Sequence, residues 1–359
     1  MDGSLAGEAL PAHGKSRTVD PMGAEHELAD ALLAAAREAG IDASEVTGLR
    51  QLSGGASKEM WAFDLVTAGG TTIPLVLRRQ PAGRRFSSQG LPSVAAEAAL
   101  VRLAEGVGVP VPSVAFELAP GSAAGDGYAM ARITGETVGG RVLKLPELEQ
   151  ARAGMARHCG EILARIHGAG GYEPLGLRQI GAHEELAALE ERHRLTGHDR
   201  PVFEFALRWL KGRLPVERAR VLLHGDFRNG NLMVGPEGIR AVLDWELAHV
   251  GPPAYDLAWL CVTSWRFQRP DLPVGGFGTR EDLIAGYEAA GGAPVDRAEL
   301  HAWEVFQTMN WGVMCAGVAE AFLEGSRSIE AGVIARRASE TEFDLMRLLA
   351  PDHEAWNVR

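Results

Sequence analysis

Short runs in which apolar and polar residues alternate fill much of the first third of the chain, a pattern typical of half-buried β-strands. Residues 24–39 instead carry Leu28 and Leu32 at helical spacing, and a second helix is predicted over 94–104 with Ser93 as its N-cap. The predicted strands lie at 46–52, 60–66, 72–77, 114–118 and 128–133. These elements predict a small sheet with helices packed on it.

After Gly135 the apolar spacing changes to the three- and four-residue steps of helices, as in 147–167 with Leu148, Met155 and Ile162. Further helices are predicted at 181–194, 201–213, 254–266, 280–290, 298–323 and 328–350. The pattern favours an α+β architecture with a junction near 131–137. The expected parts are a flexible tail at 1–22, a β-rich N-terminal lobe at 23–133 and a mainly helical C-terminal lobe at 134–359.

Length and composition support a folded protein with two lobes. The 359 residues exceed what a single core comfortably fills, and 46% hydrophobic with 23% charged residues is ordinary for a globular chain. A net charge of −11 argues against nucleic acid or an anionic membrane surface as partner. No apolar run has the length of a membrane-spanning helix, and the N-terminus lacks the pattern of a secretion signal. Three isolated cysteines predict buried free thiols in a reducing cytoplasm.

The segment from His224 to Asn231 has the most informative chemistry in the chain. A tight β-hairpin is predicted immediately after it, which brings Asn231 and Asp244 to neighbouring positions at the open end of the hairpin. Two oxygen ligands suit Mg²⁺, which takes few protein ligands and completes its shell with phosphate and water. Asp226 lies in the loop before the hairpin, close enough to orient an attacking alcohol. These groups are typical of phosphoryl transfer.

The order His-x-Asp-x-x-x-x-Asn, followed by a metal-binding Asp, resembles the catalytic layout of the protein-kinase-like fold. With Gly225 after His224 and Asp-Trp-Glu at 244–246, it is similar to the aminoglycoside phosphotransferase family of small-molecule kinases. The resemblance implies a two-lobed fold, ATP or alternatively GTP as phosphate donor, and Mg²⁺. It implies Asp226 as the catalytic base, and Asn231 and Asp244 as metal ligands. His224 and Asp256 would support the catalytic loop.

The resemblance also assigns the phosphate-binding part of the nucleotide site. The loop with Gly54, Gly55 and Ser57 falls where the family covers the phosphates, and glycine allows the backbone to approach them closely. Arg78 stands where the family usually has a lysine that reaches the phosphates and pairs with a helical glutamate, here Glu97. Each assignment has a structural alternative: an ordinary hairpin turn for the glycine loop, a solvated strand end for Arg78, and an exposed helix charge for Glu97.

Met130, Ala131 and Arg132 fall where the family connects its lobes and where main-chain groups bind the adenine edge. That task needs backbone groups rather than particular side chains, so Met130 is equally compatible with a place in the core.

The acceptor is less clearly indicated. Val-Leu-Arg-Arg at 76–79 and the segment 261–267 resemble a branch allied to acyl-CoA dehydrogenase-associated phosphotransferases, which implies a hydroxy acid or hydroxyacyl thioester as acceptor. Trp265, Arg266 and Trp311 are expected to contact this small molecule, although tryptophans on helices also pack in cores. An aminoglycoside or other antibiotic is the alternative acceptor, but the candidate segments lack a dense acidic cluster. A nucleotide-binding pseudokinase or regulatory module is the alternative of a different class, and it would need no base.

Overall fold

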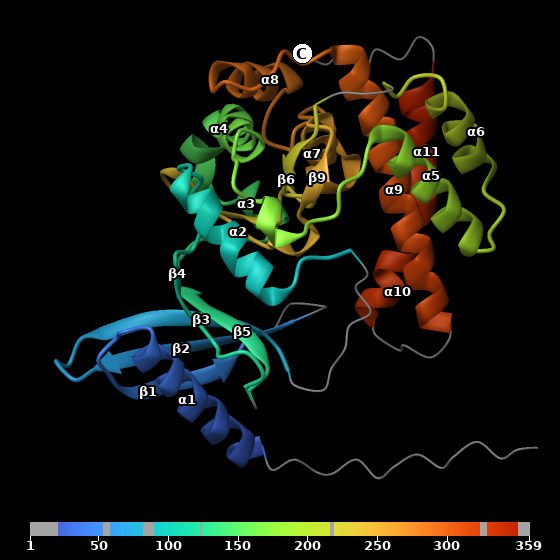
Figure 1. Ribbon diagram of the computed structural model, residues 1–359. Coiled ribbons are helices and arrows are strands. Elements are labelled where there is room, and N and C mark those ends of the chain that lie inside the picture. Colours follow the sequence, from blue (N-terminus) through green and yellow to red (C-terminus); the bar gives the residue numbers. More distant parts are fainter. Residues whose placement is uncertain are drawn as a thin grey trace, which may run out of the picture.

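The computed structural model describes residues 21–52, 58–81, 90–122, 124–215, 219–323 and 329–350. An antiparallel sheet with helix α1 (Pro21–Glu38) forms one end of the molecule, and a larger helical region forms the other (Figure 1). Helix α1 begins three residues before its predicted start, and residues 1–20 of the predicted tail lie outside the described residues.

Five strands form the N-terminal sheet in the order β1-β2-β3-β5-β4, with antiparallel neighbours. Alternate residues of the central strands point to the core side, where Leu65 and Leu77 pack with Leu28 and Leu32 of α1. The bounds are β1 Ala43–Gln51, β2 Glu59–Thr67, β3 Thr72–Gln80, β4 Val114–Glu117 and β5 Asp126–Ala131. All five predicted strands are therefore present, with ends shifted by a few residues.

Helix α2 (Val94–Gly106) connects the two regions through its side chains. Ser93 caps it as predicted, because its hydroxyl accepts a hydrogen bond from the Ala96 N–H at 3.1 Å. Residues in its first half, such as Ala98, pack against the sheet, whereas Leu100 and Val101 belong to the core of the helical region. Figure 1 shows α2 between the sheet and the C-terminal helices. This position brings Glu97, near the start of α2, close to both regions.

The helical region contains longer helices and short 3₁₀ turns. A predicted helix over 254–266 was too long, because the chain leaves helical geometry at Val262 and continues in a 3₁₀ turn. The predicted helix over 328–350 is two helices. The α-helices are α3 Gly139–Val142, α4 Glu149–His167, α5 Ala182–Leu195, α6 Pro201–Leu210, α7 Ala254–Cys261, α8 Arg280–Ala289, α9 Arg297–Leu323, α10 Ile329–Ala335 and α11 Arg337–Leu349. The 3₁₀ turns are η1 Pro146–Leu148, η2 Glu173–Leu175, η3 Trp245–Leu247 and η4 Thr263–Arg266.

Two small antiparallel sheets lie within the helical region. Strand β6 (Val221–Leu223) pairs with β9 (His249–Gly251), and β7 (Leu232–Gly235) pairs with β8 (Gly238–Val242). The second pair is the predicted hairpin. At its open end the Leu243 N–H donates to the Asn231 carbonyl at 2.9 Å. The hairpin thus places Asn231 beside Asp244, as the sequence predicts.

Cys159, Cys261 and Cys315 are buried and form no disulfide, which confirms the expectation of free thiols. Among the described residues, none of the helices combines the length and the apolar character that crossing a membrane requires.

Candidate active site

The loop from His224 to Asn231 joins β6 to the hairpin. Its second residue, Gly225, has φ 81°, in the left-handed region that favours glycine. A Cβ at this position would lie 2.1 Å from the Leu247 carbonyl oxygen, so the close approach of two backbone segments also requires glycine. The loop is therefore packed tightly against the turn that follows Asp244.

Asp256, in the first turn of α7, fixes the start of this loop. Its carboxylate accepts hydrogen bonds from the N–H groups of His224 at 2.8 Å and Gly225 at 2.9 Å, and it contacts His167 Nε2 at 3.3 Å. Burial on its own would raise the pKa of Asp256, but the hydrogen bonds from the His167 side chain and from the His224 N–H help to hold it below its usual value. The structure thus places Asp256 where the sequence predicts a support for the loop.

His224 links the loop to the end of the hairpin. Its Nε2 lies 3.0 Å from the Leu243 carbonyl, and its Nδ1 accepts a hydrogen bond from the Asp226 N–H at 3.2 Å. This arrangement requires a neutral imidazole protonated at Nε2. Burial lowers the pKa of His224, which favours the same neutral form. The ring therefore orients the backbone on both sides of the candidate site.

The Asp226 carboxylate receives three side-chain donors. Its Oδ1 accepts from Trp259 Nε1 at 2.7 Å and from Arg228 Nε at 3.0 Å, and its Oδ2 accepts from Asn231 Nδ2 at 2.6 Å. Burial raises the pKa of Asp226, whereas Arg228 and Trp259 oppose the increase. Trp259 was not predicted from the sequence. Its spacing of three residues from Asp256 on one helix was the available signal, since residues so spaced share a face.

Asn231 and Asp244 form a pair of oxygen donors that fits a magnesium ion. The Asn231 amide nitrogen is engaged by Asp226, and its side-chain oxygen makes no hydrogen bond within the part of the chain that the structure describes. The Asp244 side chain is 33% exposed. No cluster of three or more His, Cys, Asp or Glu side chains suited to a metal occurs among the described residues. Two protein oxygens suit Mg²⁺ bound together with phosphates, rather than an ion enclosed by protein ligands.

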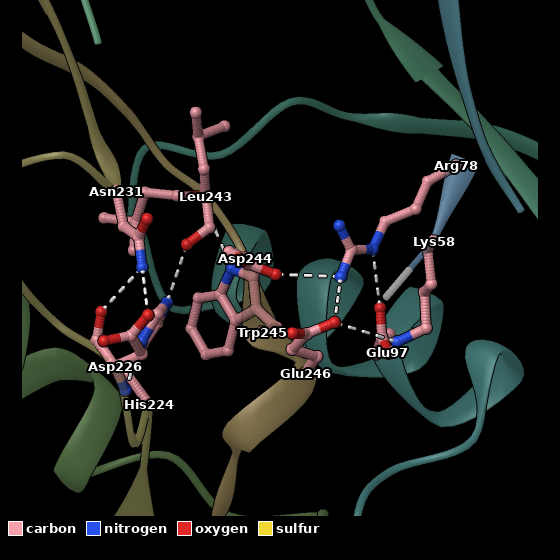
Figure 2. A network of polar contacts seen from close by, with 11 residues as sticks. Lys58, Arg78, Glu97, His224, Asp226, Asn231, Leu243, Asp244, Trp245 and Glu246 are labelled. Atoms are coloured by element: carbon pink, nitrogen blue, oxygen red, sulfur yellow. Dashed lines mark hydrogen bonds and ion pairs between the residues drawn. The ribbon is translucent and has the colours of Figure 1, made fainter. Parts of the chain in front are cut away.

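A cluster of charged side chains adjoins this pair and shares Asp244 with it, and Figure 2 shows Trp245 between His224 and Glu246. Arg78 Nε donates to Glu97 at 2.9 Å, and its Nη2 donates to both Asp244 and Glu246 at 2.8 Å. Burial on its own would lower the pKa of Arg78, but the charges of Glu97 and Asp244 raise it above its usual value. The expected contact between Arg78 and Glu97 is therefore present.

Lys58 is a second cation in this cluster, and it was not predicted from the sequence. Its Nζ pairs with Glu97, and it lies 3.3 Å from a Glu246 oxygen. Lys58 follows the predicted phosphate loop directly, which was the only sequence signal for its position.

Comparisons with known proteins agree with this geometry. Residues 48–299 match the model of the phosphotransferase enzyme family. The chain belongs to this family. It has the α+β kinase-like fold expected from its sequence.

One solved structure with this fold comes from Ralstonia eutropha, and its own assignment as an aminoglycoside phosphotransferase is provisional. It is 21% identical with a TM-score of 0.69, covering 92% of this chain and 97% of its own. A thermostable mutant of aminoglycoside phosphotransferase APH(4)-Ia, in a ternary complex with ADP and hygromycin B, is 19% identical with a TM-score of 0.59. That alignment covers 85% of this chain and 95% of the other.

Mouse acyl-CoA dehydrogenase family member 10 is 30% identical over 199 residues, covering 52% of this chain. The alignment covers 18% of that relative, so the chain corresponds to less than a fifth of its length.

The remaining predicted nucleotide contacts of this phosphotransferase are only partly described. Gly54, Gly55 and Ser57 lie outside the described residues. Met130 packs in the core with Val76, its partner on the neighbouring strand of the sheet. The N–H groups of Ala131 and Arg132 donate to the carbonyls of Ser113 and Pro74, at 2.9 and 3.0 Å. Those two N–H groups are therefore not available to an adenine ring, which corrects that part of the expectation.

The predicted acceptor residues have different environments. Trp265 packs between two other tryptophans of one cluster. Its ring centroid lies 5.2 Å from that of Trp259 and 4.9 Å from that of Trp311. The Arg228 guanidinium lies 4.7 Å above the Trp265 ring. Arg266 is buried and donates to the Cys261 carbonyl and to Glu304, both internal partners. This corrects the expectation that Arg266 contacts the acceptor, whereas the two tryptophans stay predictions.

A pocket of about 700 Å³ opens next to the catalytic loop. A Cβ on Gly139 would lie 2.3 Å from the Phe267 ring and 3.0 Å from Asn229 Oδ1, so the wall around Phe267 adjoins the loop. The pocket is lined by Gly140, Lys144, Thr263, Ser264, Phe267, Gln268, Val333, Arg336, Arg337, Glu340, Phe343 and Asp344. Its size and position suit a small-molecule acceptor.

Proposed function

We propose that this phosphotransferase moves the γ-phosphate of ATP to a hydroxyl of a small acid, carried as a hydroxy acid or a hydroxyacyl thioester. The observation that carries the proposal is the Asp226 carboxylate, 13% exposed and bonded to Asn231 at 2.6 Å, beside the Asp244 side chain, which is 33% exposed. A carboxylate adjoining a pair of oxygen donors is what in-line phosphoryl transfer requires. The ADP complex of a protein with the same fold supports a nucleotide as donor.

In the proposed mechanism Asp226 orients the acceptor hydroxyl and takes its proton. The acceptor oxygen forms a bond to the γ-phosphorus while the bond from that phosphorus to the β–γ bridging oxygen breaks, and ADP leaves. Asn231 and Asp244 would hold Mg²⁺, which neutralises charge on the phosphates when bound. Positioning contributes most because the transition state is loose, and proper orientation supplies up to roughly 7–11 kcal/mol.

The chain division proposed for this activity is a tail at 1–22, a nucleotide lobe at 23–133 and a catalytic lobe at 134–359. Phosphate contacts are assigned to Gly54, Gly55, Ser57, Arg78 and Lys58, with Glu97 orienting both cations. Strand β5 ends at Ala131, close to the proposed junction, which supports the boundary.

The charge of the pocket favours an anionic acceptor over an aminoglycoside. Three basic and two acidic side chains line it, and Glu340 pairs with both Arg336 and Arg337. Lys144 pairs with no carboxylate in the described ranges. Burial raises the pKa of Asp344 to about 6, so its negative charge is lost in part as the pH falls toward that value. A polycationic aminoglycoside would meet net positive charge here, whereas a carboxylate or phosphate group would be attracted.

An acceptor screen that couples ADP release to a spectroscopic signal tests the proposal. Hydroxy acids and hydroxyacyl-CoA compounds should raise ADP release above the rate with water, and aminoglycosides should not. Asp226→Ala should abolish transfer while nucleotide binding survives, and retained turnover would remove Asp226 as the base. Turnover with aminoglycosides alone would establish the antibiotic alternative. Nucleotide binding with no ADP release for any acceptor would instead favour the regulatory module.

A further inference from the structure

Trp259 and Asp256 lie on the same face of α7, and both side chains contact the catalytic loop. Trp259 is 3% exposed, and its indole Nε1–H donates to Asp226 Oδ1 at 2.7 Å. A hydrogen bond to an ionised acceptor at this distance is stronger than one between neutral groups. The bond therefore joins the rigid helix directly to the candidate base.

Packing alone does not explain this bond, because neighbouring tryptophans lack an equivalent one. The indole nitrogens of Trp265 and Trp311, in the same aromatic cluster, are buried without a hydrogen-bond partner among the described residues. The same is true of Trp303 in the main core. Within the cluster, Trp259 alone has a hydrogen-bonded indole N–H in the described ranges, and its acceptor is Asp226.

The three donors around Asp226 differ in rigidity. Arg228 is 26% exposed at its side chain and reaches Oδ1 through a flexible stem. Asn231 binds Oδ2 and is also a candidate metal ligand. Trp259 packs against both Trp265 and Trp311, at 5.2 and 6.3 Å between ring centroids. Two χ angles, both restricted by packing, set the place of its N–H.

We propose that Trp259 is a positioning residue that holds Oδ1 of Asp226, so that Oδ2 is presented to the acceptor hydroxyl. This inference rests on the proposed function of Asp226 as the base. With the indole N–H removed, the carboxylate can turn about its Cβ–Cγ bond, because the remaining donor to Oδ1 comes from a partly exposed arginine. The substrates still bind, but fewer complexes have the reactive geometry.

The test compares Trp259→Phe with a control variant, Trp303→Phe. Both variants lose a buried indole, but the Trp303 nitrogen has no hydrogen-bond partner in the described ranges. Trp259→Phe should lower kcat about 10- to 100-fold, with the KM values for ATP and acceptor within about twofold of wild type. Its thermal midpoint should fall further than that of Trp303→Phe only by what the lost hydrogen bond contributes, and the kcat of Trp303→Phe should be unchanged. A kcat near wild type for Trp259→Phe would overturn the inference, as would a parallel loss of kcat and stability in both variants.

A second measurement keeps the inference testable if Trp259→Phe does not fold. The indole N–H proton of Trp259 should resonate downfield in the wild-type NMR spectrum and move upfield in Asp226→Asn, where the acceptor is neutral. An unmoved resonance would refute the bond. Activity of Asp226→Asn separates the two proposals: an active Asp226→Asn variant overturns the proposed base, whereas an inactive one with a fully active Trp259→Phe overturns only the positioning by Trp259.

Discussion

Asp256→Asn is the sharpest test of how the catalytic loop is held. The wild-type carboxylate is completely buried and accepts from the N–H groups of His224 and Gly225, one on each oxygen. An asparagine has one acceptor oxygen, so its NH₂ group must face one of these N–H donors. A hydrogen bond to a charged group contributes about 1.5–3 kcal/mol, and an unsatisfied buried donor costs about 1–3 kcal/mol. The substitution should therefore lower the free energy of unfolding by about 2–4 kcal/mol.

Urea unfolding at neutral pH without nucleotide measures this loss, and steady-state assays measure kcat. We expect kcat to fall by roughly 100-fold, because displacement of the loop by about 1 Å moves Asp226 away from its reactive position. Glu237→Gln is the matched acid-to-amide control, since Glu237 forms an exposed pair with Arg240 at the hairpin turn. A change in the urea midpoint for Asp256→Asn no larger than that for Glu237→Gln would refute the reasoning.

The stability difference for Asp256→Asn has a defined pH dependence. The pKa of Asp256 is lowered in the folded protein, so its contribution to stability is present above the unfolded value of about 3.9 and is lost as the pH falls through the folded value. Wild type and variant should therefore converge only in strong acid.

Three further outcomes follow from the site. Arg78→Lys should raise the KM for ATP about tenfold, because one ammonium cannot keep bonds made from two guanidinium nitrogens; an unchanged KM would show that the fork is dispensable. Asp244→Ala should weaken nucleotide binding in the presence of Mg²⁺ by calorimetry, and unaltered Mg²⁺ dependence would remove Asp244 from the metal site. Asp344→Asn should raise the thermal midpoint above pH 6 but not at pH 4. Its raised pKa of about 6 means that the folded state prefers the protonated acid, so wild-type stability falls as the pH rises through that range.

Local chemistry explains why the hairpin and catalytic loop could be predicted from the sequence. The turn at 235–238 joins two short apolar runs, and Asn231 and Asp244 directly flank them. Lys58 could not be predicted in the same way, because its partners Glu97 and Glu246 are 39 and 188 residues away. Such contacts depend on how α2 and the turn after the hairpin meet the sheet, and no local pattern encodes that.

The end of α7 shows how tertiary packing overrides a helical pattern. Residues 254–266 are largely apolar, which predicts one helix. In a continuous helix Trp265 would lie about 9 Å further along the axis than Trp259 and about 120° away from it around the helix. The break at Val262 instead lets the two rings pack at 5.2 Å. The aromatic cluster that supports Asp226 therefore requires the break.

The charge of the cluster around Arg78 gives a physical reason for arginine at this position. In the described part of the cluster, Lys58 and Arg78 contribute two positive charges, and Glu97, Asp244 and Glu246 contribute three negative ones, a formal net charge of −1. A lysine could contact these carboxylates only from a single nitrogen. Arginine contacts Glu97 through Nε and the other two carboxylates through Nη2, while its Nη1 makes no hydrogen bond among the described residues. The fork can therefore keep Glu97 and still offer an N–H group to a phosphate. Because the remaining cluster is net negative, polyphosphate binding requires an additional cation, which accords with the oxygen donors of Asn231 and Asp244.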